Sequence, residues 1–238
     1  TKVLFFLPFF LLVSILSAQE LKFTTVHNSA LSNITYRVLT EAYNKLGIKI
    51  SFKYYPAKRS LVLSNEGVSY DGELHRISGI EKKFKNLIPI RIPIYILEGI
   101  VVTDKTFFKV EGWESLNSYR IGVRRGIAFA VDGTKEMNTI VLNSYEHLFQ
   151  MLKANRIDIV VMTRLSALKY FKKNEDLNLT ILEPSIQVYD MYHYLNKKNK
   201  DLVPKLKAVL KMMQKEGRIT KIRDDYIKEV YGEEFLSK

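Results

Sequence analysis

Residues 60–74 read SLVLSNEGVSYDGEL, and residues 147–161 read HLFQMLKANRIDIVV. Each stretch predicts a helix with one apolar face, then a sharp stop at a residue that tolerates positive φ, then a strand entered through an aspartate, Asp71 or Asp158. A helix that leads into a short buried strand is half of a βαβ unit. Because the pattern occurs twice, each time after its own upstream strand, the sequence predicts two similar α/β lobes and a ligand cleft between them.

The N-terminal residues form a separate zone. Lys2 precedes an apolar run over residues 3–16, and the small residues Ser17 and Ala18 follow it. This order predicts a signal peptide over residues 1–18. The alternative is a membrane anchor, but the run is shorter than the roughly 20 apolar residues that a spanning helix needs. The chain has no cysteine, which excludes a lipid anchor on cysteine, disulfides and thiol chemistry. We therefore expect a soluble periplasmic protein.

The chain is basic, with a formal net charge of +12, or +11 without Lys2. Many lysines occur in runs over residues 82–85, 197–200 and 205–211, which we interpret as solvated surface. No recognition helix, RNA-binding signature or zinc finger is present in the sequence, so nucleic acid is not an expected partner. A basic envelope protein that binds anionic polymer or lipid stays open as an alternative.

The elements of the first lobe follow from local patterns. We expect strands at 21–26 and 48–54, a helix capped by Ser32 and ended by Gly47, and a second helix that starts at Pro56. Residues 86–90 and 94–97 are expected to be extended but broken by Pro89 and Pro93. Residues 99–103 then form a strand that crosses into the second lobe.

The second lobe is expected to contain strands at 119–123, 139–142 and 157–162. Ser144 is predicted to cap the helix 145–154, and a further amphipathic helix covers 165–173. Residues 186–195 return the chain to the first lobe, where helices over 202–215 and 220–231 close it.

Three stretches carry a resemblance to a known family: YRIGVRRG at 119–126, LFQMLKANRIDIVV at 148–161, and the segment from Tyr194 to Ile219 that begins YLNKKN. In this order and spacing they resemble the family 3 periplasmic solute-binding proteins, which have the type II fold of polar amino acid uptake systems. The resemblance covers residues 19–238.

The resemblance implies an α/β fold with two lobes, each a mixed sheet flanked by helices, and a hinge of two crossing strands. The first lobe would comprise residues 19–102 and 187–238, and the second residues 103–186. It also implies a monomer without cofactor or metal that closes on a small ligand. Its membrane partner would be an ABC-type transporter, or a receptor if the protein is a sensing module.

Two positions depart from the amino-acid-binding members of that family. Their carboxylate-binding arginine corresponds to Lys83 here, and their ammonium-binding aspartate corresponds to Thr163. A neutral hydroxyl does not supply the charge that a desolvated ammonium group needs. The departures put a standard α-amino acid in doubt, and we expect a small polar, carboxylate-bearing ligand, either an amino acid or a related metabolite.

Ligand groups in this architecture come from the loops after the strands. In the first lobe these positions hold His27, Asn28, Tyr55, Arg59, Glu73, His75 and Arg76. In the second lobe they hold Arg124, Arg125, Ile127, Asn143, Thr163 and Arg164. Tyr55 and Tyr95 are candidates to stack on a flat ligand. Guanidinium groups bind carboxylates and phosphates through paired hydrogen bonds, so Arg59, Arg76 and Arg125 are the leading candidates.

Each candidate has a structural alternative. The arginines could be surface or ion-pair residues, Glu73 could simply pair with Arg76, and the tyrosines could be packing residues. Arg124 and Arg164 are expected to face solvent. Histidines at 27, 75, 147 and 193 show no metal-ligand spacing, and no catalytic motif is found. We expect no enzyme, although Glu73 with His75 leaves a dehydratase on the same fold as an alternative.

Overall fold

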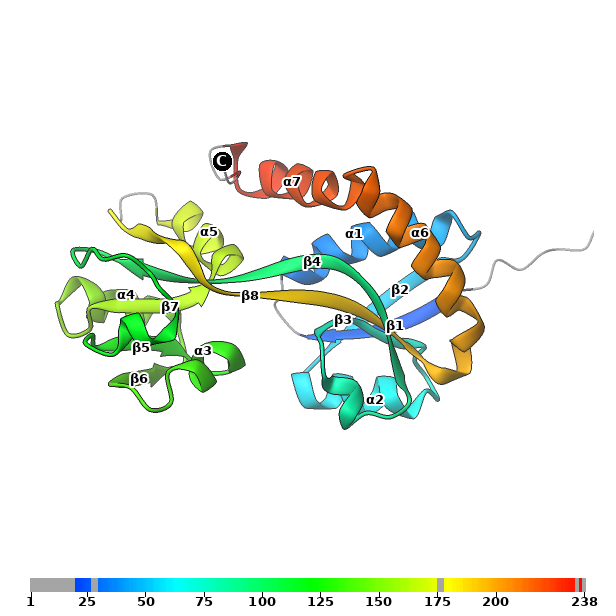
Figure 1. The fold of residues 1–238 in the computed structure, drawn as a ribbon, viewed down its shortest axis with the longest axis horizontal. Coiled ribbons are helices and arrows are strands. Elements are labelled where there is room, and N and C mark those ends of the chain that lie inside the picture. Colours follow the sequence, from blue (N-terminus) through cyan, green and yellow to red (C-terminus); the bar gives the residue numbers. More distant parts are fainter. Residues whose placement is uncertain (1–19, 27–29, 175–177, 234–235, 237–238) are drawn as a thin grey trace, which may run out of the picture.

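The computed structural model describes residues 20–26, 30–174, 178–233 and 236. They form two lobes joined by two long strands, β4 (Leu87–Thr103) and β8 (Thr180–Asn196), which run side by side through the molecule (Figure 1). The predicted signal peptide and Asn28 lie outside the described residues. None of the helices formed by the described residues has the length and hydrophobicity needed to cross a membrane.

A single mixed sheet of eight strands passes through both lobes in the order β2-β1-β3-β8-β4-β7-β5-β6. In the first lobe the parallel strands β1 and β2 stand beside β3, and in the second lobe β7, β5 and β6 are parallel. The strand bounds are β1 Glu20–Val26, β2 Lys49–Tyr55, β3 Gly72–Ile77, β5 Ile121–Arg124, β6 Thr139–Leu142 and β7 Ile159–Thr163. The predicted α/β class with two lobes is confirmed.

Helices cover the sheet in both lobes. The first lobe has α1 (Ala30–Asn44), α2 (Ala57–Glu66), α6 (Val203–Lys215), α7 (Arg218–Val230) and the 3-10 helices η1 (Ile80–Lys82) and η3 (Lys197–Leu202). The second has α3 (Ala128–Gly133), α4 (Tyr145–Lys153), α5 (Arg164–Lys173) and η2 (Trp113–Leu116).

Two helix ends test the capping predictions. The Ser144 hydroxyl accepts a hydrogen bond from the His147 amide at 3.3 Å, which confirms the predicted cap of α4. The prediction for Ser32 is wrong: α1 already begins at Ala30, and Ser32 is buried inside the helix, where its hydroxyl contacts the Thr25 hydroxyl at 3.0 Å.

The predicted breaks at Pro89 and Pro93 are also wrong, since β4 is one strand of 17 residues. Its pairing with β8 shifts register between Ile90 and Tyr95, and the shift contains Pro93. A proline has no N–H to donate, so it is tolerated where the ladder is interrupted by a bulge. The return strand β8 starts six residues earlier than expected, because residues 180–182 also pair with β4, beyond a second register shift between Gly99 and Val101.

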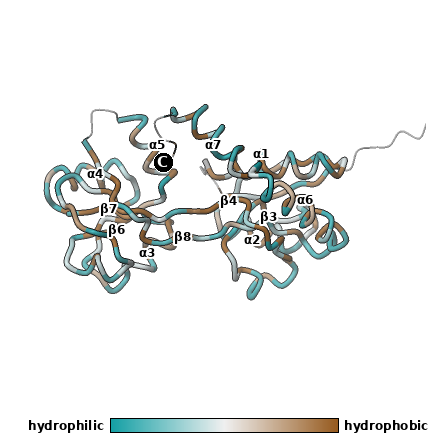
Figure 2. Tube along the Cα trace, turned by 45° about the horizontal axis from the view of Figure 1, so that its top comes forward, coloured by the Kyte–Doolittle hydropathy of each residue, from teal (hydrophilic) through white to brown (hydrophobic). Residues whose placement is uncertain are grey.

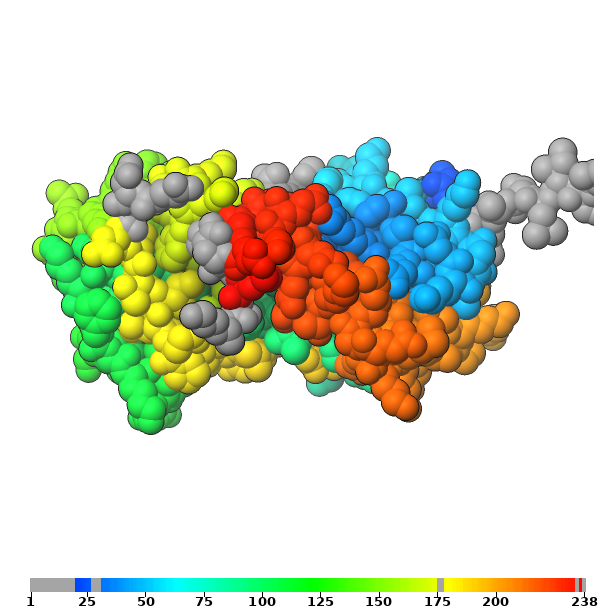
Figure 3. Space-filling model, turned by 90° about the horizontal axis from the view of Figure 1, so that it is seen from above, coloured from blue at the N-terminus to red at the C-terminus, as the bar shows by residue number. Residues whose placement is uncertain are grey.

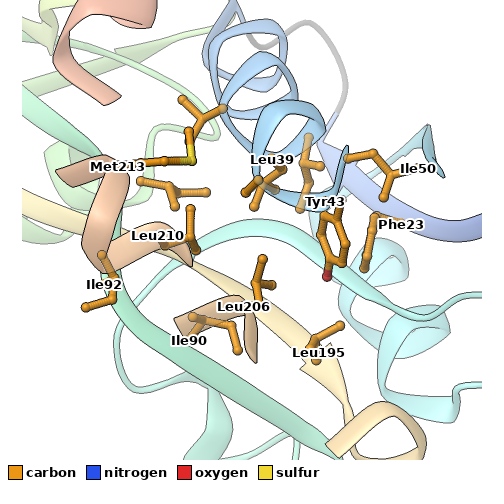
Figure 4. Packing of buried hydrophobic residues seen from close by; sticks show 14 of the residues in the cluster. Phe23, Leu39, Tyr43, Ile50, Ile90, Ile92, Leu195, Leu206, Leu210 and Met213 are labelled. Atoms are coloured by element: carbon orange, nitrogen blue, oxygen red, sulfur yellow. The ribbon is translucent and has the colours of Figure 1, made fainter. Parts of the chain in front are cut away.

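Hydrophobic residues lie along the central strands, and the helices alternate between hydrophobic and hydrophilic residues along their length (Figure 2). The core of the first lobe packs α1 and α6 on the sheet, with Phe23, Tyr43, Leu195, Leu206 and Met213 among its fully or nearly fully buried side chains (Figure 4). The second lobe has one core on each face of its sheet, around Phe149 and Val161 respectively.

A fourth apolar cluster joins the two lobes. It brings Leu31 and Ile34 of α1 together with Leu165 and Leu168 of α5, and Tyr226, Ile227 and Tyr231 at the C-terminal end complete it. Seen from above, α7 lies between the second lobe and α1 (Figure 3). The lobes are therefore connected by packed helices as well as by β4 and β8.

Candidate functional site

The strand directions place the carboxyl ends of the first lobe's strands opposite the carboxyl ends of the second lobe's strands. β4 runs from the first lobe to the second and β7 is antiparallel to it, so β5, β6 and β7 run towards the first lobe. By the same argument β8 runs back, and β1, β2 and β3 run towards the second lobe. The loops that carry most of the predicted site residues therefore lie on the facing sides of the lobes, which α2 and α3 border in Figure 1.

An aromatic and cationic group forms at the end of β2. The Arg59 guanidinium lies 5.5 Å from the ring centroid of Tyr55, and the Tyr55 hydroxyl contacts the Tyr70 hydroxyl at 2.5 Å. Burial and the Tyr55 hydrogen bond raise the pKa of Tyr70 to about 12, so the Tyr70 hydroxyl stays protonated at neutral pH. Arg59 itself is exposed, which leaves its hydrogen-bonding edge accessible to a ligand.

Glu73 and Arg76 form an ion pair in the same lobe, with Oε1 and Nη2 2.8 Å apart. Residues three apart on a regular strand point to opposite faces, but β3 has a register shift between these two residues, which brings both to the α2 side. Arg76 Nη2 also donates to the Ala57 carbonyl in the first turn of α2 at 3.3 Å. The bulge thus positions Arg76 at the end of the sheet.

The Glu73 carboxylate is fully buried among polar neighbours. Its Oε2 accepts hydrogen bonds from the hydroxyls of Ser60 at 2.6 Å and Thr24 at 2.7 Å. Burial raises the pKa of Glu73, although Arg76 and the two hydroxyls oppose the shift. Arg76 is 15% exposed, and its buried Nε has no hydrogen-bond partner among the described residues. Glu73 Oε1 also lacks a hydrogen-bond partner among the described residues, so each member of the pair keeps one buried atom without a hydrogen bond.

His75 lies apart from that ion pair. Its Nδ1 contacts the Thr35 hydroxyl of α1 at 2.9 Å, inside the lobe. Burial, with help from the charge of Arg76 and from His193, lowers the pKa of His75 to about 3, so the ring is neutral. Glu73 and His75 are therefore on different sides of β3, and the structure does not bring them together as an acid–base pair.

Tyr95 belongs to the hinge. It packs against the apolar cluster that joins the lobes, and burial raises its pKa. The structure gives it neighbours on α7 instead of neighbours among the other predicted site residues.

In the second lobe the structure brings Arg125 and Asn143 together. Arg125 Nε donates to Asn143 Oδ1 at 2.9 Å, and both residues are exposed. Ile127 directly precedes α3 and packs partly into the core of the lobe. Arg124 does not simply face solvent as expected, because it is partly buried with its guanidinium 5.0 Å from the ring centroid of Tyr145.

Thr163 and Arg164 follow β7. The Thr163 side chain caps α5 by accepting a hydrogen bond from the Ser166 amide at 3.2 Å. The expectation that Arg164 faces solvent is wrong. Its guanidinium is largely buried and pairs with Glu98 of β4 at 2.5 Å and Glu183 of β8 at 2.8 Å, which fixes the start of α5 to both hinge strands.

The predicted residues therefore form two groups, one per lobe: Tyr55, Arg59, Glu73 and Arg76 in the first, and Arg125 and Asn143 in the second. Among the described residues no ion pair or side-chain hydrogen bond joins the two groups. Lys83 is exposed beside η1 and belongs to neither. Nowhere in the part of the chain that the structure describes do three His, Asp or Glu side chains gather as a metal site would require.

Sequence reasoning missed the polar residues that hold Glu73. Thr24 occupies a buried position of β1, and Ser60 and Ser64 occupy the buried face of α2. The helix and strand periods assign all three hydroxyl residues to the core. Because buried hydroxyls need hydrogen bonds, this pattern indicates a buried polar partner.

No protein-family model matches this chain. An uncharacterized protein of Shewanella oneidensis strain MR-1 is 28% identical over 188 residues, which are 76% of this chain and 70% of that protein. Among solved structures, an ancestral arginine-binding protein bound to arginine has a TM-score of 0.63 and 22% identity, over 87% of this chain and 97% of that one.

Two further solved structures have the same fold. The L-cystine solute receptor of Neisseria gonorrhoeae, in its unliganded open conformation, has a TM-score of 0.67 and 13% identity over 93% of this chain and 97% of its own. A histidine kinase sensor domain with similarity to periplasmic binding proteins has a TM-score of 0.66 and 13% identity over 88% and 96%. The chain thus has the two-lobe fold of periplasmic amino-acid-binding proteins.

Proposed function

We propose that this protein is a periplasmic solute-binding protein that captures a small anionic ligand between two lobes and delivers it to an ABC-type transporter. The lobes would be residues 19–102 with 187–238 and residues 103–186, and closure would occur about β4 and β8. The observation that carries the proposal is the placement of arginines on facing sides of the lobes, Arg59 and Arg76 on one and Arg125 on the other.

The surroundings of these arginines support an anionic ligand. Arg125 has a neutral partner, Asn143, and Arg59 has an aromatic ring, and neither forms an ion pair with a carboxylate of the described residues. Arg76 is paired with Glu73 but has a buried Nε without a partner among the described residues. A carboxylate or phosphate would satisfy several of these donors at once.

The same residues disfavour a ligand that carries an ammonium group. Glu73 is the acidic member of the first group, and its charge is already paired with Arg76 while its Oε2 accepts hydrogen bonds from two hydroxyls. Thr163, at the position where the resembled family has an aspartate, is a helix cap. A desolvated ammonium would find no carboxylate partner there. This supports dicarboxylates or phosphorylated metabolites over standard amino acids.

A sensing module for a membrane receptor is the second candidate, because a histidine kinase sensor domain shares this fold. In that case the closed state itself, instead of delivery of the ligand, would be the output. The dehydratase alternative is not proposed, since Glu73 and His75 lie on different sides of β3.

Ligand titration by calorimetry tests the proposal. The chain is screened against dicarboxylates, phosphorylated metabolites and amino acids, and the best ligand is titrated into Arg125→Ala. We expect its Kd to rise about ten- to hundredfold, the effect of losing hydrogen bonds to a charged group. Arg156→Ala is the matched control, because Arg156 is also exposed on the second lobe but lies before β7, at its amino end. Equal Kd values for both variants would refute the assignment of Arg125.

A further inference from the structure

The positive charge of the chain is concentrated in one lobe. Residues 19–102 and 187–238 contain 24 Lys and Arg against 15 Asp and Glu, a formal charge of +9. Residues 103–186 contain 12 against 10, a formal charge of +2. Such an asymmetric field orients a molecule as it approaches an anionic partner.

The densest part of this charge lies on residues 197–211, in η3 and α6. We call it the distal basic surface, and it consists of six exposed lysines: Lys197, Lys198, Lys200, Lys205, Lys207 and Lys211. Asp201 is the one acidic residue between positions 197 and 211. Lys198 pairs with Asp71 at 3.0 Å, whereas within the described residues the other five lysines have no ion pair.

The surface extends sideways and includes apolar side chains. The Lys197 amide donates to the Asn86 carbonyl at 2.8 Å, which holds the loop with Lys85 next to η3. A surface hollow at this junction is lined by three of the lysines, by Glu66 and by Val68, and Val68 is 86% exposed. On α6, Met212 is 41% exposed beside Lys211. Cations and protruding apolar groups therefore occur together.

The position of the surface separates it from the candidate site. In Figure 1, η3 and α6 form the end of the first lobe that is farthest from the second lobe, whereas the site groups lie where the lobes face each other. A partner bound at this end would leave β4, β8 and the second lobe uncovered.

We propose that the distal basic surface docks on the surface of an anionic phospholipid bilayer. All six cations are lysines, which act as point charges and need no aligned partner, as suits mobile lipid head groups. The exposed Val68 and Met212 can enter the interface between head groups and acyl chains. Docking would hold the first lobe at the membrane while the second lobe moves.

Sedimentation of the full chain with vesicles tests this inference. Vesicles of phosphatidylcholine mixed with phosphatidylglycerol are compared with pure phosphatidylcholine. In the test variant Lys197, Lys200, Lys205 and Lys207 are replaced by Gln. In the matched control Lys105, Lys169, Lys172 and Lys173, exposed lysines of the second lobe, are replaced by Gln. Both variants lose four charges and keep the same N-terminal residues.

We expect binding to the anionic vesicles alone, weakened by added salt. The test variant should bind at least about 100-fold more weakly, since each lysine near an anionic membrane contributes about a factor of five. The control should bind almost as well as the parent chain. Equal losses in both variants would overturn the inference, because net charge alone would then explain binding. Retention of duplex DNA without retention of vesicles would also overturn it.

Discussion

At the scale of single residues, Glu73 is a carboxylate whose burial requires compensation of its charge. It is fully buried, and the Arg76 guanidinium supplies the one opposite charge that contacts it among the described residues. Removing one partner of a buried ion pair usually costs far more than the pair itself contributes, because a buried charge is left without compensation. The pair therefore makes Arg76 a structural residue even if it also binds a ligand.

We predict that Arg76→Ala lowers the free energy of unfolding by about 3 kcal/mol at pH 7.5. The loss should shrink at pH 5, because a Glu73 pKa that burial raises in the folded state favours folding at low pH and opposes it as pH rises through that pKa. Urea denaturation at both pH values measures this.

The double variant Glu73→Gln with Arg76→Ala is the control, and its unfolding free energy relative to the parent should change much less with pH. A loss in Arg76→Ala that is the same at both pH values would contradict a buried, charged Glu73 as the cause of the loss.

Arg125→Ala is therefore a cleaner probe of ligand binding than Arg76→Ala, because Arg125 is exposed and has a neutral partner.

Two buried histidines predict acid sensitivity. Burial lowers the pKa of His75 to about 3 and that of His193 to about 4, whereas both take up a proton near pH 6.5 when unfolded. Their contribution to stability is present above pH 6.5 and is lost as pH falls, by about 1.4 kcal/mol per pH unit for each ring.

In His75→Gln, the unfolding free energy should depend less steeply on pH between 6 and 4.5, because unfolding takes up about one proton fewer. Denaturation at several pH values measures this slope. His147→Gln, at an exposed position on α4, should keep the slope of the parent chain. A parental slope in His75→Gln would show that this ring is protonated in the folded state.

At the scale of elements, sequence patterns predicted most strands and helices because the apolar periods are strong. They failed where pairing decides the outcome: Pro93 suggested a break in β4, but a register shift against β8 absorbs it. Strand pairing also decides the placement of Glu73 and Arg76. They share a side of the sheet because of a bulge, and no residue type in the sequence predicts that bulge. Arg125 and Asn143 were predicted only as residues of loops that follow consecutive strands, and their contact follows from the parallel pairing of β5 and β6.

The contact between β4 and α3 depends on the absence of a side chain at Gly99. A Cβ atom at this position would stand 2.5 Å from a ring carbon of Phe129. We predict that Gly99→Ala destabilises the protein by about 1–3 kcal/mol, the usual cost of overpacking. Urea denaturation measures it, and Phe129→Leu in the same chain should recover part of the loss. Additive losses in the double variant would contradict a direct clash.

At the scale of the whole molecule, the two lobes are connected by β4, β8 and the apolar cluster of α1, α5 and α7. Closure about this connection requires the site groups to approach each other. The chain has no native cysteine, so spin labels can be placed uniquely.

We predict that labels on Lys58→Cys, in α2, and Lys135→Cys, after α3, move closer when the ligand identified by calorimetry is added. Pulsed electron paramagnetic resonance measures the distance. The pair Lys135→Cys and Arg156→Cys, both in the second lobe, should keep its distance. An unchanged distance between the lobes at saturating ligand would contradict a closing mechanism.

The route of the chain also orders its folding. Everything between β4 and β8 in sequence belongs to the second lobe, so that lobe can assemble from one uninterrupted stretch. The first lobe cannot do so, because its core needs Leu195, Leu206 and Met213 to cover Phe23 and Tyr43. As the chain emerges from its N-terminus, the N-terminal strands cannot complete their core until residues almost 200 positions later are present. The lobe whose strands come first in the sequence is thus the lobe whose core is completed last.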